Sequence, residues 1–126
     1  MIFIDGGVTA PKGFKAAGIY AGIKKKRKDM ALVYSVVPSA GAGTFTTNIV
    51  KAAPVKWDIK LTKESGNIQA VIINSGVANA CTGEEGWKNN YLMARAVADS
   101  LQLPVESVYT ASTGVIGKQM PIDIIV

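Results

Sequence analysis

Short apolar runs alternate along this chain with turns rich in glycine, proline or charge. The runs 14–23 and 29–37 are rich in Ile, Val, Tyr and Ala and flank a basic segment, which predicts two antiparallel strands joined by a charged turn. The residues between the second run and the next helix begin with a flexible loop, expected over 38–43. Residues 68–73 form an almost continuous apolar run that is typical of a buried strand, and 107–111 predicts another strand.

Two segments carry apolar residues at helical spacing instead. Over 54–65 the apolar side chains recur four residues apart, with Pro54 acceptable in the first turn and Gly66 placed to end the helix. A second helix is expected to run from Thr82 to Ser100 or Gln102, because Thr82 and Glu85 have the spacing of a capping box. Its apolar face is expected to consist of Trp87, Tyr91, Ala94, Ala98 and Leu101.

The composition fits one domain that occupies residues 1–126. The hydrophobic fraction of 48% is ample for a core, whereas the charged fraction of 18% is low for a free-standing domain. Two interpretations stay open at this point. Either the chain has one dense core, or part of its apolar surface is covered by another chain.

The formal charge of +5 is concentrated in residues 24–28, which are all Lys or Arg. No aromatic residue is interleaved with these cations, and they lie between two predicted strands, so we expect a solvated turn. A patch that binds nucleic acid or a membrane surface is the alternative interpretation.

The single cysteine, Cys81, excludes an internal disulfide and fits a reducing compartment. No stretch approaches the roughly 20 apolar residues of a membrane span, and the first residues do not have the pattern of a signal peptide. The cytoplasm is therefore the expected location.

Two glycine-bearing polar segments are the candidates for chemistry. In the segment 112–117, the Thr113 hydroxyl and the Gly114 N–H can donate to one oxygen, as in an oxyanion hole; an ordinary glycine turn is the alternative. In the segment 74–83, Asn74 and Asn79 can orient a polar substrate or satisfy loop backbone groups. Both segments are predicted to be turns that follow strands.

The chain lacks the usual sets of residues for nucleophilic and general acid–base catalysis. It has no histidine, so neither a Ser-His-Asp nor a Cys-His site can be built from it alone. Cys81 is expected to be a small buried apolar residue. The carboxylates form no convincing acid/base pair, and we expect no metal site.

Several short blocks of the sequence match one known family, in the order in which they occur there: Gly13-Phe14, Gly22-Ile23-Lys24, and residues 27–32, 43–48, 52–55, 74–83 and 112–117. Through these blocks the chain resembles the ornithine acetyltransferase family, also called bifunctional glutamate N-acetyltransferase/amino-acid acetyltransferase. One departure is visible, because Val77 stands where the family usually has an asparagine.

The resemblance implies a layered α/β fold, a sandwich of sheets and helices, and a precursor that cuts itself into an α and a β chain, assembled as α2β2. The new N-terminal threonine of the β chain is the nucleophile, and its own amine can act as the base. It takes acetyl from N-acetylornithine and gives it to glutamate, and some members also use acetyl-CoA.

For this chain, the resemblance implies the front part of the α chain, with Thr113 and Gly114 as the oxyanion hole and Asn74 and Asn79 as substrate-binding or site-shaping residues. No cofactor, nucleic acid or membrane is expected as a partner. Two alternatives stay open: a related N-terminal-nucleophile aminopeptidase or amidase, and a non-catalytic basic binding module whose binding weakens steeply with salt.

Overall fold

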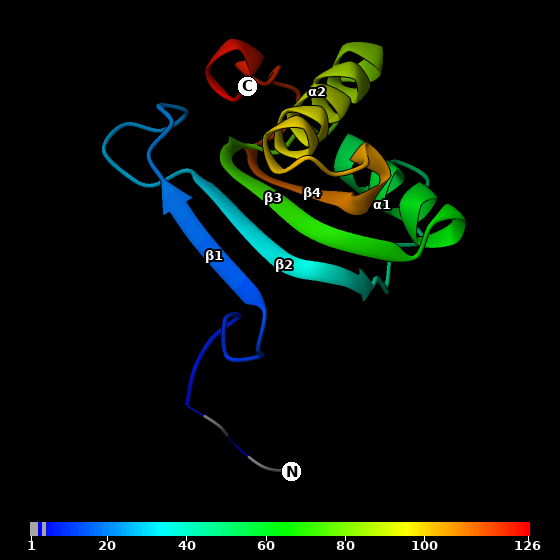
Figure 1. Cartoon of the computed structure of the whole chain (residues 1–126). Coiled ribbons are helices and arrows are strands. Elements are labelled where there is room, and N and C mark those ends of the chain that lie inside the picture. The colour runs from blue at the N-terminus through cyan, green and yellow to red at the C-terminus, as the bar shows by residue number, and fades with distance from the viewer. Residues whose placement is uncertain (1–2, 4) are drawn as a thin grey trace.

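The structure is a computed structural model that describes residue 3 and residues 5–126. Its centre is a four-stranded sheet in the order β1-β2-β3-β4 (Figure 1). The strands are β1 (Phe14–Ile19), β2 (Met30–Ala40), β3 (Asn67–Val77) and β4 (Val108–Val115). The first three pair antiparallel in sequence order, and β4 pairs parallel to β3. The predicted antiparallel pair and both later strands are thereby confirmed.

Alternating burial explains how β3 sits in the sheet. Ile68, Ala70 and Ile72 are buried, whereas the alternating residues Val71 and Ile73 are only half-buried. Successive side chains of a strand point to opposite faces, so one face of the sheet is packed and the other is open. The predicted loop at 38–43 begins later than expected, because β2 continues to Ala40 after a register irregularity between Tyr34 and Ser39.

Both predicted helices are present. Helix α1 (Ala53–Glu64) has Pro54 in its first turn, and α2 (Gly83–Leu101) forms the crossover between the two parallel strands. Two short 3-10 turns, Val105–Ser107 and Ile122–Ile124, follow. In the described part of the chain, no helix has the length and apolar character needed to cross a bilayer.

Helix α1 protects the outer edge of β4. Trp57 Nε1 donates to the Val108 carbonyl oxygen at 2.9 Å, and the Thr110 N–H donates to Asp58 Oδ1 at 3.0 Å. These two side chains satisfy backbone groups that a neighbouring strand would otherwise pair, so the first part of this edge is closed to further strands. Burial raises the pKa of Asp58 to about 6, although the hydrogen bond from Thr110 works in the opposite direction.

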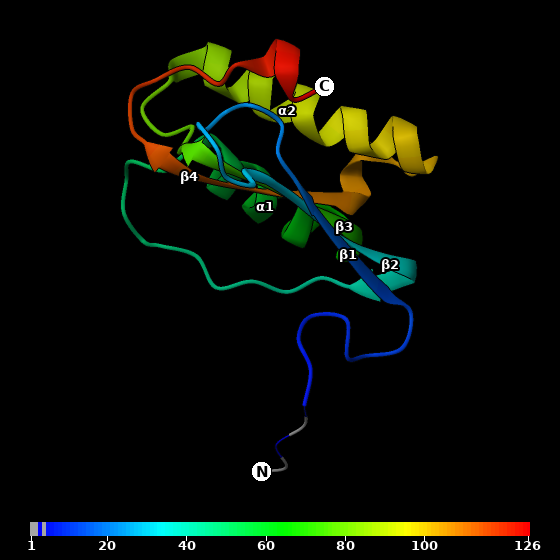
Figure 2. The same cartoon turned by 90° about the vertical axis from the view of Figure 1, so that its left-hand side faces the viewer.

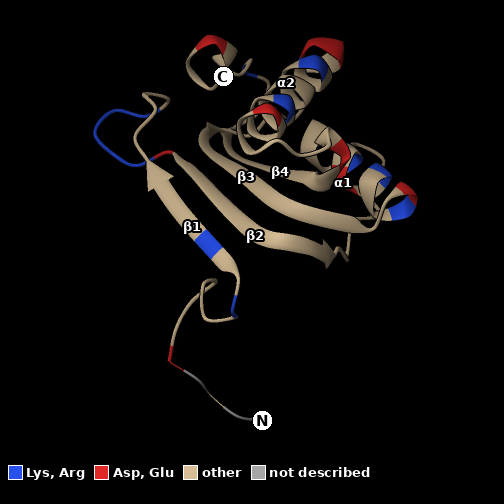
Figure 3. Cartoon of the chain, viewed as in Figure 1, with Lys and Arg blue, Asp and Glu red and all other residues tan. Residues whose placement is uncertain are grey.

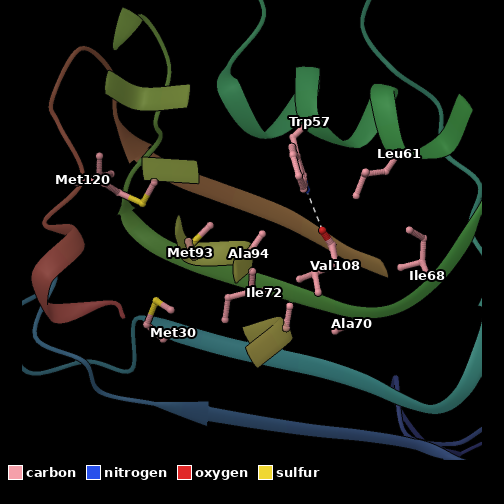
Figure 4. Close-up of a cluster of buried hydrophobic side chains, with 12 residues drawn as sticks. Met30, Trp57, Leu61, Ile68, Ala70, Ile72, Met93, Ala94, Val108 and Met120 are labelled. Atoms are coloured by element: carbon pink, nitrogen blue, oxygen red, sulfur yellow. Dashed lines mark hydrogen bonds between the residues drawn. The ribbon is translucent and has the colours of Figure 1, made fainter. Parts of the chain in front are cut away.

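The core lies between one sheet face and the two helices (Figure 4). Trp57 meets Trp87 and Tyr91 of α2 edge-on, with ring centroids 5.9 Å apart in both pairs. The buried members of the core are Met30, Trp57, Leu61, Ile68, Ala70, Ile72, Val77, Met93, Ala94, Ala98, Val108 and Met120.

The predicted apolar face of α2 is partly wrong. Ala94 and Ala98 are buried as expected, but Trp87 and Tyr91 are 38% and 36% exposed. The buried stripe passes through Asn90 and Met93 instead, so the helix is rotated slightly from the orientation that its aromatic residues indicated. The two aromatic rings form the border of the core, where they contact Trp57.

The second face of the sheet carries no helix among residues 5–126. Register places Val33, Val71, Ile73 and Ala111 on this face, and all four are half-buried. Figure 2 shows α2 over one side of the sheet and the connection between β2 and α1, residues 41–52, as an open arc on the other. No helix among the described residues therefore covers this apolar face.

Candidate active site

The two glycine-bearing segments lie side by side at the carboxyl ends of the parallel strands. Asn74, Ser75 and Gly76 are the register partners of Ser112, Thr113 and Gly114, respectively. The predicted turns begin later than expected, because β3 continues to Val77 and β4 to Val115. Residues 78–82 and 116–117 lie outside the strands, as predicted. The parallel pairing gives both backbones hydrogen-bond partners, which single-segment reasoning could not supply.

Gly114 occupies a position that only glycine fits. Its φ is +135°, and a Cβ added there would lie 2.2 Å from the Gly76 carbonyl carbon and 2.4 Å from the Gly76 oxygen. Gly76 also has a positive φ, of +125°. The two strand ends thus approach more closely than any side chain would permit.

Thr113 and Gly114 are both exposed residues at this strand end. A hollow of about 300 Å³ opens beside the partner strand on the helix-free face and includes Ala31, Ile73 and Ser75 in its lining. A hydroxyl and a neighbouring backbone N–H at an open strand end are groups that can stabilise a developing negative charge.

Asn74 and Asn79 do not reach the surface, since both are 0% exposed. Asn74 Nδ2 donates to the Val77 carbonyl oxygen at 2.9 Å, and Asn79 Nδ2 donates to the Gly86 carbonyl oxygen at 2.9 Å. Both amides therefore hold the chain between β3 and α2 in place. Val77 is 2% exposed and belongs to the core, so the departure from the family pattern places an apolar side chain among apolar neighbours.

The predicted capping box is wrong. Thr82 precedes α2, but its hydroxyl donates to Asn79 Oδ1 at 2.7 Å and makes no cap hydrogen bond to the helix. The hydrogen bond between the Thr82 and Asn79 side chains therefore takes the place of a side-chain cap at the start of α2.

Cys81 is exposed, contrary to the expectation of a buried residue. Its φ of +56° belongs to a tight turn in which Asn79 and Thr82 face inward. The thiol lines a hollow of about 590 Å³ together with Lys51, Lys56 and Trp87.

The basic loop behaves as predicted except at its first lysine. Figure 3 shows its cations beyond the end of β1, and residues 25–28 are exposed. Lys24, in contrast, is half-buried and donates through Nζ to Ser75 Oγ. Sequence reasoning missed this contact. The available signal was Asp29, an acidic residue directly after five cations, which accepts backbone hydrogen bonds from the loop.

The fold and this strand end define an α/β protein with an exposed Thr-Gly pair at the carboxyl end of the parallel strands of a mixed sheet. The family model described as "ArgJ family" matches residues 15–126, and the chain belongs to that family.

Relatives and solved structures agree with this assignment. "Arginine biosynthesis bifunctional protein ArgJ" of Thermotoga neapolitana is 54% identical over 114 residues, which are 90% of this chain and 29% of that protein. The protein of the same name from Symbiobacterium thermophilum is 52% identical over 126 residues, covering 98% of this chain and 31% of that protein.

Two crystal structures share the fold. The arginine biosynthesis bifunctional protein of Bacillus halodurans superimposes with a TM-score of 0.92 at 44% identity, over 95% of this chain and 63% of that chain. Ornithine acetyltransferase from Mycobacterium tuberculosis, complexed with ornithine, gives 0.90 at 47% identity, over 94% and 65%. The expected α/β fold of this family is thereby confirmed. The chain spans about a third of the length of the curated relatives.

Proposed function

We propose that this chain supplies the oxyanion hole of an arginine-biosynthesis acetyltransferase that moves acetyl from N-acetylornithine to glutamate. The observation that carries the proposal is the open Thr113-Gly114 pair at the end of β4, backed by a glycine on the neighbouring strand. The printed names of the relatives, and the ornithine in one solved structure, support the pathway and the substrate class.

In the proposed reaction, a threonine hydroxyl on the β chain of the same precursor attacks the acetyl carbonyl carbon. The carbonyl oxygen becomes an oxyanion, to which the Thr113 hydroxyl and the Gly114 N–H donate. The C–N bond to ornithine then breaks, ornithine leaves with the proton, and an acetyl-threonine ester remains. The glutamate amine attacks this ester, the C–O bond breaks, and the threonine hydroxyl regains its proton.

Preorganised donors act mainly on the transition state, because negative charge develops on the oxygen only as the nucleophile attacks the carbonyl. The strand pairing suits this role. Thr113 and Gly114 are held by β3, so little reorganisation is needed when the charge develops. We propose Asn74 and Asn79 as site-shaping residues, because their buried amides hold the chain that follows the partner strand.

The test is Thr113→Ala in the full-length, self-processed protein that contains this chain. We expect kcat for acetyl transfer from N-acetylornithine to glutamate to fall roughly 100- to 1000-fold, with KM nearly unchanged. Thr9→Ala, at an exposed threonine in the N-terminal segment, is the matched control. Processing must be checked by mass first, since self-cleavage also passes through an oxyanion. Equal kcat for Thr113→Ala and wild type would assign Thr113 to structure alone.

The same assays separate the competing functions. Release of free acetate or amino acid without transfer to glutamate would favour an aminopeptidase or amidase. Acetylation of glutamate from acetyl-CoA would establish that second donor. Tight, strongly salt-dependent binding of nucleic acid without turnover would favour a basic binding module.

A further inference from the structure

The loop between β1 and β2 is folded around a buried carboxylate. Asp29, 3% exposed, accepts the Ala21 N–H through Oδ1 and the Lys24 N–H through Oδ2, each at 2.7 Å. Burial raises the pKa of Asp29, but the backbone donors, that of Lys24 first among them, outweigh it and hold the pKa below its usual value. The backbone of Lys24 is thus tied to the residue that directly precedes β2.

The same loop is tied to the end of β3. The Ser75 N–H donates to the Asp29 carbonyl oxygen at 2.8 Å. A Cβ added to Gly76 would lie 2.7 Å from Ile23 Cγ2 and 3.3 Å from Lys24 Cγ, so the lysine stem passes directly over this glycine. The Lys24 ammonium then donates to Ser75 Oγ. Figure 1 shows the loop and the carboxyl ends of β3 and β4 at one end of the sheet.

Register brings these contacts to the candidate oxyanion hole. Ser75 is the partner of Thr113, and Gly76 is the partner of Gly114. Paired residues of neighbouring strands share a face and lie about 5 Å apart. Lys24 therefore bonds to Ser75 and lies over Gly76, the two register partners of the Thr-Gly pair, whereas the next four cations of the loop are exposed.

We propose that Lys24 is a positioning residue of the acetyl-transfer site. Its ammonium holds Ser75, and through Ser75 the end of β4, and it places a fixed positive charge beside the oxyanion donors. This inference rests on the proposed function. A nearby cation stabilises negative charge that develops in the transition state more than it stabilises a neutral substrate, so its removal acts on kcat.

The experiment compares Lys24→Met with Lys25→Met in the full-length processed protein. Methionine keeps the length of the stem and removes the charge at both positions. We expect Lys24→Met to lower kcat roughly 10- to 30-fold, the effect of a unit charge acting across about two strand spacings at an effective dielectric constant of about 20, with KM within about twofold of wild type. Lys25→Met should match wild type, because its side chain is exposed.

A restored ammonium distinguishes charge from folding. Lys24→Cys treated with bromoethylamine regains an ammonium at nearly the original distance, and its kcat should recover, with wild type treated in parallel because Cys81 is exposed. In the double variant Lys24→Met/Thr113→Ala, the losses should be less than multiplicative, because both changes act on one oxyanion.

Three results would overturn the inference: equal kcat for Lys24→Met and Lys25→Met, no recovery after aminoethylation, or fully multiplicative losses. If the processed wild type transfers no acetyl, the proposed function fails and this inference falls with it. If wild type and Thr113→Ala behave as expected but Lys24→Met equals its control, only this inference fails.

Discussion

At the scale of single residues, two fully buried asparagines differ in how their amides are hydrogen-bonded. Asn79 uses both ends of its amide, since Nδ2 donates to Gly86 and Oδ1 accepts from Thr82. Asn90, in the middle of α2, is 0% exposed, and neither amide atom has a hydrogen-bond partner among the described residues. Sequence alone could not predict this difference, because it depends on the groups that surround each amide in the fold.

Substitution by leucine, which has a similar volume, should separate the two. Asn79→Leu leaves the Gly86 carbonyl and the Thr82 hydroxyl without their partner, and should lower the free energy of unfolding by about 2–4 kcal/mol. Asn90→Leu should be neutral or stabilising by up to about 1 kcal/mol, because it removes two buried groups that pair with nothing. Urea unfolding of both variants measures this difference, and equal losses would contradict it.

Gly114 gives a second residue-scale prediction. Gly114→Ala should cost more than about 3 kcal/mol, because its Cβ would overlap the backbone of Gly76 and the positive φ adds strain. Gly117→Ala is the matched control, since Gly117 also has a positive φ but a Cβ there would meet nothing within 4 Å. It should cost only about 1–2 kcal/mol. Comparable losses of stability in thermal unfolding would show that strain, and not the close strand approach, decides the cost at both sites.

At the scale of elements, α1 stabilises β4 through side chains as well as through packing. Asp58 accepts a backbone hydrogen bond from the strand edge, and burial raises its pKa to about 6. A carboxyl whose pKa is raised in the folded state contributes most to the stability of the fold when it is protonated. Its contribution to stability is therefore full below the ordinary value of 3.8 and is lost as the pH rises through about 6.

Asp58→Asn keeps the acceptor oxygen and removes the titration. Relative to this variant, wild type should lose stability between pH 4 and pH 7. The pKa difference alone corresponds to roughly 3 kcal/mol, which partial exposure of the carboxyl reduces to about 1–2 kcal/mol. Unfolding free energies at several pH values measure it, with Asp99→Asn, at an exposed position of α2, as the control. A pH-independent difference between wild type and Asp58→Asn would refute the role of this carboxyl.

Periodicity predicted the helices and strands well, because their signals are local. Apolar residues four apart identified α1, and a continuous apolar run identified β3. The errors lie where partners distant in sequence decide the structure. The segments at Gly76 and Gly114 become strands only because they pair with each other, and the Thr82 hydroxyl bonds to Asn79 and not to the helix.

The same limit applies to the candidate site. The glycine-rich composition of 74–83 and 112–117 singled out two segments far apart in the sequence, and the structure places residues 74–77 in register with 112–115. The contact between Lys24 and Ser75 spans 51 residues and depends on how the basic loop turns around Asp29. No pattern within the loop distinguishes Lys24 from the cations that follow it.

At the scale of the whole molecule, one face of the sheet is packed and the other is open. Val33, Val71, Ile73 and Ala111 form an apolar surface that is only half-buried. Apolar side chains on a sheet face normally pack against a second layer. The open face therefore supports the interpretation, raised by the low charged fraction of 18%, that another polypeptide segment covers part of this chain.

The open face and the residue composition together predict that the chain is inactive on its own. The 126-residue chain by itself should show no transfer of acetyl from N-acetylornithine to glutamate above the uncatalysed rate. It has no histidine, and its one cysteine is not paired with a general base of that kind, so it presents charge-stabilising donors without an activated nucleophile. Donors alone act only after a nucleophile has attacked the carbonyl.

The measurement is an acetyl-transfer assay of the isolated chain, whose folding is first checked by circular dichroism. The full-length processed protein, assayed at the same molar concentration, is the positive control. The isolated chain should also bind a hydrophobic dye that the full-length protein excludes, because the sheet face that holds Val71 and Ile73 is then uncovered. Robust turnover by the isolated chain would place the nucleophile within residues 1–126 and would rule out Thr113 and Gly114 as donors that depend on a second polypeptide.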